Sequence, residues 1–305
     1  MAVVLTPTTA QVVDRRKFLG GSDVAAILGI SPWRTALDVY LDKVQPREES
    51  HDPARQRVLS RGKRMEPYIV DLLRDEAGLV IIARGARYID PEAPFLAAEI
   101  DAEAETGENI EIKTVSPFKA REWGEQQTDE IPIHYTAQVQ HGLMVTGRRL
   151  CVLGVLIGAD DFRIYRVERD DETIAAMRER EIAFWREHVE RGIPPEPTTV
   201  ADIKALYGRD AGTAIEASED VLRALNDYRN LSDQAKAIAA QAEAAKERIQ
   251  LFMADAAILT VGGKPAATWK SQSASRFDQS AFKAAHPDLY EQFKATSESR
   301  VFRIK

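Results

Sequence analysis

The sequence AEIDAEAETGENIEIK, residues 98–113, decides the predicted fold. Its two halves are typical of short β-strands, and the Gly-containing segment at residues 106–109 between them is typical of a turn. In such a hairpin, Asp101 and Glu111 can approach each other across the paired strands. Side chains two apart on a strand share a face, so Lys113 joins Glu111, whereas Ile112 points into the core and leaves its carbonyl near the acidic pair.

This arrangement predicts a metal site for phosphodiester hydrolysis. Asp101, Glu111 and the main-chain carbonyl of Ile112 are hard oxygen ligands of the kind that Mg²⁺ or Mn²⁺ prefers. Lys113 is placed to orient or activate the attacking water, and a bound metal ion stabilises charge on the phosphate. The same pattern is also compatible with a cross-strand Glu–Lys pair on a solvated sheet face.

Further strands and helices are predicted on both sides of this stretch. Alternating apolar runs predict strands at residues 79–90, 149–158 and 162–169. Helical spacing predicts helices at residues 59–77, 134–145 and 173–191. The order of elements is therefore mixed α/β.

A domain boundary is predicted near residues 197/198. The segment IPPEPTT, residues 193–199, follows Gly192 and cannot continue a helix. Beyond it, one long helix is predicted at residues 218–257. Its apolar residues recur at alternating steps of four and three, namely at Leu231, Ala235, Ile238, Ala242, Ala245, Ile249, Phe252 and Ala256. This seam suits a partner helix, and packing against its own domain or a folded-back hairpin is an equal alternative.

The end of the chain is predicted to form short β elements. Residues 257–270 resemble a hairpin that turns at Gly262 and Gly263, and the alternating sequence SRVFRIK at residues 299–305 predicts a terminal strand.

Composition excludes several classes of protein. The chain has 305 residues, of which 44% are apolar and 29% charged, so a sizeable folded core is expected. A net charge of −7 excludes a globally basic surface but leaves local basic patches. The single cysteine, Cys151, excludes an intramolecular disulfide, a Cys-rich zinc site and a four-thiolate iron–sulfur cluster. No apolar run approaches about 18 residues and no secretory signal is recognisable, so we expect a cytoplasmic protein without membrane contact.

Four segments, in this order, carry a resemblance to a known family. They are Arg15 with GGSDVAAILGISPW (residues 20–33), RGKRMEP (61–67), Asp101 followed by EIK (111–113), and YTAQVQHGLMVTG (135–147). Over residues 14–191 the chain resembles the YqaJ-type viral recombinase nucleases, relatives of phage lambda exonuclease in the PD-(D/E)xK superfamily. The resemblance implies an α/β fold. A restriction-endonuclease-like core, with a central mixed sheet flanked by helices, would occupy residues 1–197, and residues 198–305 would form a helical extension ending in short strands.

The resemblance also implies roles for single residues in catalysis. Glu66 is a helix carboxylate near the metal ions, Asp101 and Glu111 bind them, and Lys113 serves the attacking water. Gln138 matches the family glutamine beside the active site.

The family's first metal aspartate is usually followed by glycine and preceded by proline, whereas this chain reads Glu99-Ile100-Asp101-Ala102. Glu99 or Glu103 is therefore an alternative ligand. Without the resemblance, the favoured interpretation of Gln138 is a polar residue on an ordinary helix face.

Two positions match those that hold a terminal 5′ phosphate in the family, namely Arg15 and Ser22. Guanidinium and hydroxyl donors suit a phosphate on physical grounds as well. The alternative is that Arg15 lies in a solvated basic run and that the GGSD segment is only a turn and helix cap.

A basic cluster precedes Glu66 and predicts a phosphate track. Five cations lie within ten residues: Arg55, Arg57, Arg61, Lys63 and Arg64. Such a track predicts salt-dependent DNA binding. Trp33 and Trp123 either stack on bases or belong to the core.

The predicted function is that of a Mg²⁺-dependent 5′-to-3′ exodeoxyribonuclease, with Mn²⁺ as a possible substitute, that resects linear double-stranded DNA for single-strand annealing recombination. The residues themselves argue only for metal-assisted phosphodiester cleavage. The resemblance further implies a ring-shaped homo-oligomer, a single-strand annealing protein as partner, and a phage- or prophage-type protein in a bacterial host. The alternatives are an endonuclease with the same metal site and a catalytically silent DNA-binding or assembly module.

Overall fold

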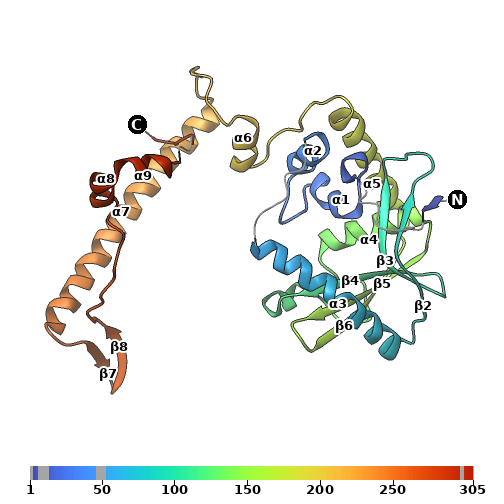
Figure 1. Cartoon of the computed structure of the whole chain (residues 1–305), viewed down its shortest axis with the longest axis horizontal. Coiled ribbons are helices and arrows are strands. Elements are labelled where there is room, and N and C mark those ends of the chain that lie inside the picture. The colour runs from blue at the N-terminus through green and yellow to red at the C-terminus, as the bar shows by residue number, and fades with distance from the viewer. Residues whose placement is uncertain (1–2, 6–13, 46–52, 296–298, 305) are drawn as a thin grey trace. The chain divides into compact units, whose positions relative to one another are not determined.

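The computed structural model describes residues 3–5, 14–45, 53–295 and 299–304 (Figure 1). The chain divides into two compact units, Met1–Leu206 and Tyr207–Lys305. The division falls after helix α6 (Val200–Leu206) rather than at the expected 197/198. Helix α6 is held by the first unit, because Thr35 Oγ1 donates to Asp202 Oδ1 at 2.9 Å. No helix of the described part of the chain is long and apolar enough to cross a membrane.

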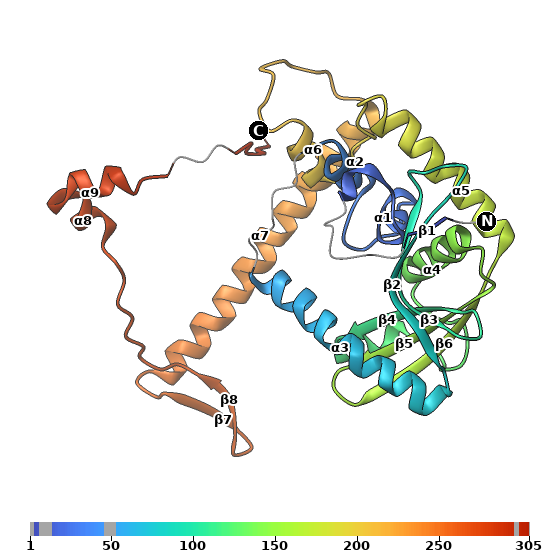
Figure 2. The same ribbon diagram turned by 45° about the vertical axis from the view of Figure 1, so that its right-hand side comes forward.

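The first unit is built around a six-stranded mixed sheet, which Figure 2 shows from the side of β2. In spatial order the strands are β1 (Val3–Leu5), β2 (Ile81–Ile89), β3 (Ala97–Ala104), β4 (Asn109–Val115), β5 (Leu150–Ile157) and β6 (Asp161–Glu168). Neighbouring strands are antiparallel except for β4 and β5, which run parallel. A parallel pair needs a crossover, and helix α4 (Ile133–Thr146) supplies it.

Two helices cover opposite faces of the sheet. Helix α3 (Pro53–Ala77) packs Ile69 and Leu73 against a cluster that contains Ile112 of β4. Helix α4 packs on the other face, in a cluster with β3 residues. Successive residues of β5 alternate between the two clusters, as a strand covered on both sides requires. The predicted α/β core with a mixed sheet flanked by helices is confirmed.

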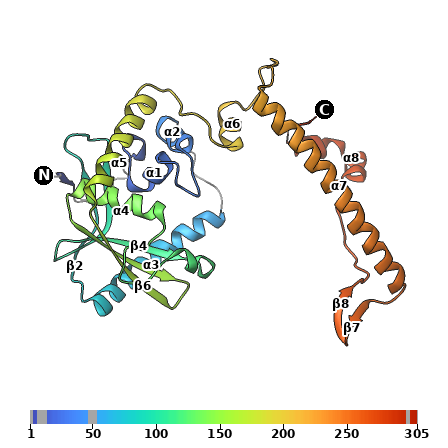
Figure 3. The same ribbon diagram turned by 180° about the vertical axis from the view of Figure 1, so that it is seen from behind.

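Shorter elements complete the first unit. They are η1 (Arg15–Lys17), α1 (Gly21–Ile27), α2 (Ala36–Val44), η2 (Pro117–Glu122), α5 (Asp171–Phe184) and its π-helical continuation η3 (Trp185–Val189). Figure 3 shows α4 beside α5 on the same side of the strands.

The predicted helices and strands of this unit are present, with shifted ends. Helix α3 begins at Pro53 instead of residue 59 and includes Pro67. It ends at Gly78, whose φ of 65° is in the left-handed region that glycine adopts without strain.

The second unit has one long helix and a small sheet. Helix α7 (Glu219–Met253) begins at Ser218, whose hydroxyl accepts a hydrogen bond from the Val221 N–H. Strands β7 (Ile258–Val261) and β8 (Lys264–Thr268) form the predicted hairpin.

Two differences from the sequence interpretation follow the hairpin. The short helices α8 (Gln279–Ala285) and α9 (Pro287–Gln292) were not predicted. The predicted strand at residues 299–305 is wrong for the described residues 299–304, which have no regular structure. In the described part of the chain no strand pairs with them, and Arg300 instead donates to the Tyr207 carbonyl at 3.2 Å.

Candidate active site

The β3–β4 hairpin brings Asp101 to strand β4. The ladder between these strands pairs Ala102 with Ile110 and Glu103 with Asn109, next to Asp101 on β3. Asp101 Oδ2 accepts a hydrogen bond from the Ile112 N–H at 2.8 Å. Ile112 itself is buried against α3, as predicted.

Glu111 and Lys113 lie on the same face of β4 and meet Gln138 from α4. Lys113 Nζ is 2.5 Å from Glu111 Oε1 and 3.1 Å from Gln138 Oε1. Gln138 Nε2 donates to the same Glu111 oxygen at 2.7 Å. The three side chains are therefore joined in one polar cluster in which Gln138 fixes both charged partners.

The protonation of this cluster is unusual. Burial raises the pKa of Asp101 to about 7, and the charges of Glu111 and Glu66 act in the same direction. Burial acts to lower the pKa of Lys113, but the charge of Glu111 outweighs it and the pKa lies above its ordinary value. Glu66, half-buried on α3, thus lies close enough for its charge to affect Asp101.

The donor set fits a divalent cation. A carboxyl with a pKa near 7, raised partly by neighbouring carboxylates, marks a site in which added positive charge is favourable. Among the described residues, no three His, Cys, Asp or Glu side chains are gathered closely enough to hold a metal ion. Asp101 and Glu111 would therefore need a ligand of another kind to complete the set, and the carbonyl of Ile112 is the one that the sequence predicts.

The alternative ligands are engaged or directed elsewhere. Glu103 is buried and accepts hydrogen bonds from the Tyr88 hydroxyl and Arg148 Nη2, both at 2.6 Å. Glu99 is exposed and stands opposite Arg87 in the β2–β3 ladder. Asp101 is the carboxylate of β3 that reaches β4.

The two residues assigned to a terminal phosphate lie together. Arg15 Nη2 donates to Ser22 Oγ at 3.2 Å, and both residues are exposed. A buried ion pair, which sequence reasoning missed, supports them: Lys43 Nζ lies 2.7 Å from Asp23 Oδ2 and donates to the Arg15 carbonyl at 3.0 Å. In the sequence, Asp23 of the GGSD segment is the residue that could have indicated this ion pair.

The GGSD segment also brings this pair close to the polar cluster. A Cβ atom at Gly21 would lie 3.0 Å from Gln138 Cγ and 3.1 Å from the Gln138 carbonyl oxygen. Only glycine permits helices α1 and α4 to approach this closely at Gln138. The segment is therefore more than a turn and helix cap.

An aromatic cluster connects the site to the surface. Lys113 Nζ lies 5.0 Å from the centre of the Tyr135 ring, and the His134 ring is next to Tyr135. The Trp33 ring meets the His134 ring edge-on, with 4.6 Å between the ring centres, and Trp33 is 59% exposed. Trp123 stacks on Tyr135 but is only 5% exposed, so it belongs to the core and is not available to bases.

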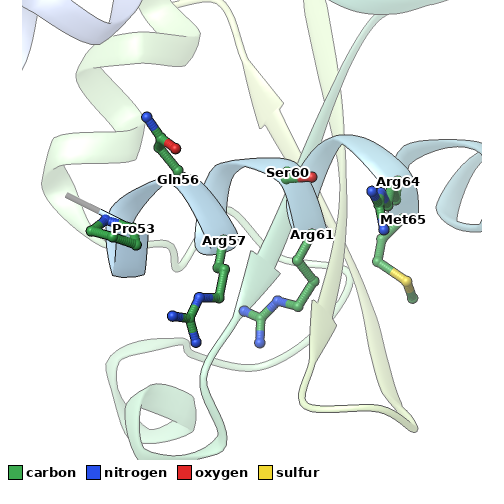
Figure 4. A pocket seen from close by; sticks show the side chains of 7 residues that line it. All are labelled: Pro53, Gln56, Arg57, Ser60, Arg61, Arg64 and Met65. Atoms are coloured by element: carbon green, nitrogen blue, oxygen red, sulfur yellow. The ribbon is translucent and has the colours of Figure 1, made fainter. Parts of the chain in front are cut away.

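Three cations of the basic cluster, Arg57, Arg61 and Arg64, recur at helical spacing and lie on one side of α3, whereas Lys63 extends from another side. Arg57, Arg61, Lys63 and Arg64 are all exposed, and the side chain of Arg55 lies outside the described residues. Figure 4 shows Arg57 and Arg61 extending from the same side of the helix, where they line an open pocket of about 580 Å³. A Cβ atom at Gly62 would lie 3.6 Å from Thr114 Oγ1. Helix α3 therefore passes close to Thr114, the residue of β4 that follows Lys113.

His141 is structural. It is fully buried, its Nδ1 lies 2.8 Å from Glu181 Oε2, and its Nε2 donates to the Ala97 carbonyl at 3.0 Å. It ties α4 to β3 and α5, and it takes no part in the polar cluster.

Comparison with known proteins gives related sequences and folds. The model of the YqaJ-like viral recombinase domain matches residues 12–149. The chain is 31% identical over 304 residues to the protein YqaJ of Bacillus subtilis (strain 168), covering 96% of this chain and 92% of that protein. Among solved structures, the alkaline exonuclease LHK-Exo from Laribacter hongkongensis aligns with a TM-score of 0.45 and 20% identity over 59% of this chain and 91% of its own. A phage related exonuclease from Haemophilus somnus 129PT aligns with a TM-score of 0.40 and 16% identity, and the alignment covers 57% of this chain and 94% of that protein.

Proposed function

Because this chain belongs to the YqaJ-like viral recombinase family, we propose that it is a metal-dependent deoxyribonuclease with its active site at Asp101, Glu111 and Lys113. The observation that carries the proposal is the joining of Glu111, Lys113 and Gln138 in one cluster, with Asp101 hydrogen-bonded to the same strand. A solvated Glu–Lys pair needs neither the glutamine from α4 nor the half-buried aspartate.

Each residue has a role that its contacts support. Asp101, Glu111 and the Ile112 carbonyl would hold Mg²⁺ or Mn²⁺, which supplies charge stabilisation and a more acidic water when bound. Lys113 lies beside Glu111, where its ammonium group can hold the attacking water by a hydrogen bond. Gln138 holds the side chains of Lys113 and Glu111 in place by hydrogen bonds, and Glu66 adds negative charge from α3.

End recognition is assigned to Arg15 and Ser22. A guanidinium and a hydroxyl 3.2 Å apart on an exposed surface suit a terminal 5′ phosphate. Since Gly21 holds this segment against Gln138, an anchored 5′ end would lie near the cleavage site. We therefore propose 5′-to-3′ exonuclease action on linear double-stranded DNA.

Duplex DNA would reach the site along α3. The exposed cations Arg57, Arg61, Lys63 and Arg64, and with them Arg55, would contact backbone phosphates. The acidic remainder of the chain, with its net charge of −7, would limit binding elsewhere.

The test is digestion of linear duplexes that carry either a 5′ phosphate or a 5′ hydroxyl, in Mg²⁺ or in EDTA. The wild-type chain is expected to release nucleotides in Mg²⁺ and faster from the 5′-phosphate end, and Lys113→Ala is expected to release none above background. Equal rates on both ends would remove the role of Arg15 and Ser22. Cleavage of a covalently closed circle would favour the endonuclease alternative, and the absence of any metal-dependent release would favour a silent DNA-binding module.

The resemblance also supports a setting for this activity. We propose a ring-shaped homo-oligomer that encloses DNA, a single-strand annealing protein as partner, and action in the cytoplasm of a bacterial host during phage-type recombination. Light scattering of the chain with and without duplex DNA would test the ring, and co-purification with an annealing protein from the same genome would test the partner.

A further inference from the structure

Helix α7 presents an apolar stripe that the described parts of the second unit leave uncovered. Of its 35 residues only Met253 is buried. Along the stripe, Leu231 is 64% exposed, Ile238 66% and Phe252 79%. Long helices in water depend on packing of their apolar face more than on helix propensity, so this stripe requires a partner.

The stripe is a heptad repeat that runs the length of α7. Its a positions are Val221, Tyr228, Ala235, Ala242 and Ile249, and its d positions are Ala224, Leu231, Ile238, Ala245 and Phe252. Every one of these ten residues is exposed or half-buried in the second unit. A two-stranded coiled coil buries such a seam.

The order of large and small residues selects the direction of pairing. A parallel pair places each residue against its own copy, which stacks alanine on alanine at residues 224, 235, 242 and 245 and Phe252 on Phe252. An antiparallel pair with Ala235 opposite Ile238 places large residues against small ones. The facing pairs are then Val221 with Phe252, Tyr228 with Ala245, Ala235 with Ile238, Ala242 with Leu231, and Ile249 with Ala224. Four of the five pairs join a large residue to alanine, which gives an evenly filled core.

The flanking charges favour the same direction. In the antiparallel pair the g positions of the two helices are neighbours, so Asp227 of each copy faces Arg248 of the other. In a parallel pair the neighbours of these residues are Ser232 and Met253, which carry no charge. Among the described residues, the ion pairs within α7 do not use Asp227 or Arg248.

We propose that α7 pairs with α7 of a second copy of this chain as an antiparallel coiled coil in which Ala235 faces Ile238. A helix of 35 residues is about 50 Å long. Since each chain enters α7 at Glu219, the two nuclease units are attached at opposite ends of the coil. The proposal does not depend on the nuclease activity, and its tests do not measure it.

Cysteine cross-linking in the full-length chain tests both the partner and the direction. The natural Cys151 is buried and is common to all variants. Ala242→Cys and Leu231→Cys chains, tagged to differ in mass, are oxidised separately and as a refolded mixture. A disulfide that joins the two different chains is expected only in the mixture, because in an antiparallel pair each cysteine lies roughly 16 Å along the axis from its own copy. Disulfides within each separate sample would show a parallel pair, and no disulfide in the mixture would show that α7 does not pair with itself; either result overturns the proposal.

The molar mass in solution gives an independent test. Ile238→Glu places a charge in the seam and is expected to halve the mass of the assembly, whereas Ala240→Glu, on the outer face of the same helix, leaves the mass unchanged.

Asp227→Arg and Arg248→Asp each create two like-charge contacts and are expected to raise the dissociation constant at least tenfold, and the double variant is expected to restore it. A mass unaffected by Ile238→Glu, or a double variant no better than the single ones, overturns the proposal.

Discussion

At the scale of single residues, the carboxyl of Asp101 sets the response of the site to pH. Its pKa of about 7 is due first to burial and then to the charges of Glu111 and Glu66. In its proposed role as a metal ligand Asp101 has to be ionised, so a proton would leave when the ion binds. We expect metal affinity to fall about tenfold for each pH unit below pH 7.

Calorimetry of Mg²⁺ or Mn²⁺ binding at pH 6 in buffers of different ionisation enthalpy measures this proton release directly. Nearly one proton is expected for the wild-type chain and almost none for Asp101→Asn, which keeps the shape but does not titrate. Equal proton release by both chains would contradict the assignment.

The same raised pKa destabilises the metal-free protein as pH rises. Between about pH 4 and pH 7 the folded chain holds the Asp101 proton while the unfolded chain has lost it, so the free energy of unfolding falls with rising pH. Chemical denaturation in EDTA is expected to show this decrease for the wild-type chain and a smaller one for Asp101→Asn.

The buried pair of His141 and Glu181 makes a separate contribution to stability. Burial acts to lower the pKa of His141, but the charge and hydrogen bond of Glu181 outweigh it and raise the pKa. His141→Leu leaves the Glu181 carboxylate buried without a partner and is expected to lower the free energy of unfolding by about 3–5 kcal/mol. The double variant with Glu181→Met is expected to recover most of this loss in urea denaturation. A single variant as stable as the wild-type chain would show that the pair is dispensable.

Single residues also show what the sequence could predict. Glu111 and Lys113 share a face because side chains alternate along a strand, and the short hairpin brings Asp101 beside them. Local sequence rules are therefore enough to predict the positions of all three residues. Asp23 of α1 and Lys43 of α2 are too far apart in sequence for a helix or strand repeat to predict their contact. Its partners are set by tertiary packing, which is why sequence reasoning missed it.

At the scale of elements, the contact between α1 and α4 depends on the absence of a side chain at Gly21. Gly21→Ala would force Gln138 and its main-chain carbonyl away from α1. We expect a loss of about 1–3 kcal/mol in stability and a fall in cleavage rate, because Gln138 fixes both Lys113 and Glu111.

Gly20→Ala is the matched control for this prediction. Its added Cβ would meet nothing closer than 3.5 Å, and Gly20 has an ordinary extended φ of −110°. Only a small change in thermal stability and rate is expected. If both alanine variants behave alike, the close approach at Gly21 is not what positions Gln138.

The exposed arginines of α3 give a prediction for DNA binding. Arg57→Ala and Arg61→Ala each remove one cation from the exposed side of α3 that lines the open pocket. Each is expected to weaken duplex binding at low salt and to reduce the slope of log K against log salt by about 1. Fluorescence anisotropy over a salt series measures this, with Arg209→Ala in the second unit as the control, and an unchanged slope would remove α3 from the DNA path.

The elements divide into those that local pattern predicts and those that it does not. Strands β2 to β6 and helix α4 follow from periodicity and from glycine ends such as Gly147, whose φ is 72°. Helices α8 and α9 have too few residues to show a period, and the terminal residues 299–304 alternate without a neighbouring strand to pair with. Alternation alone does not make a strand, because the main-chain groups need partners.

At the scale of the whole molecule, the division after Leu206 places the proposed catalytic residues and helix α7 in different units. All side chains of the polar cluster, the Arg15–Ser22 pair and the basic cluster of α3 belong to the first unit. Residues 1–206 retain α6 and its contact with Thr35, whereas a chain that ends at residue 197 loses the buried Asp202 and its partners. We therefore expect a chain of residues 1–206 to fold cooperatively and one of residues 1–197 to be less stable by thermal denaturation.

The shorter chain also separates the proposed nuclease activity from the proposed pairing of α7. Residues 1–206 lack α7, so any self-association that depends on the coiled coil is lost, while Mg²⁺-dependent nucleotide release per site should stay within a few fold of the full-length rate. The full-length Ile238→Glu chain is the control, because it loses the same association without losing any residue of the second unit. A truncated chain that folds but releases no nucleotides, beside an active Ile238→Glu chain, would show that the second unit takes part in cleavage by contacts other than the pairing of α7. Equal loss of activity in both would mean that the nuclease works only as the α7-paired assembly.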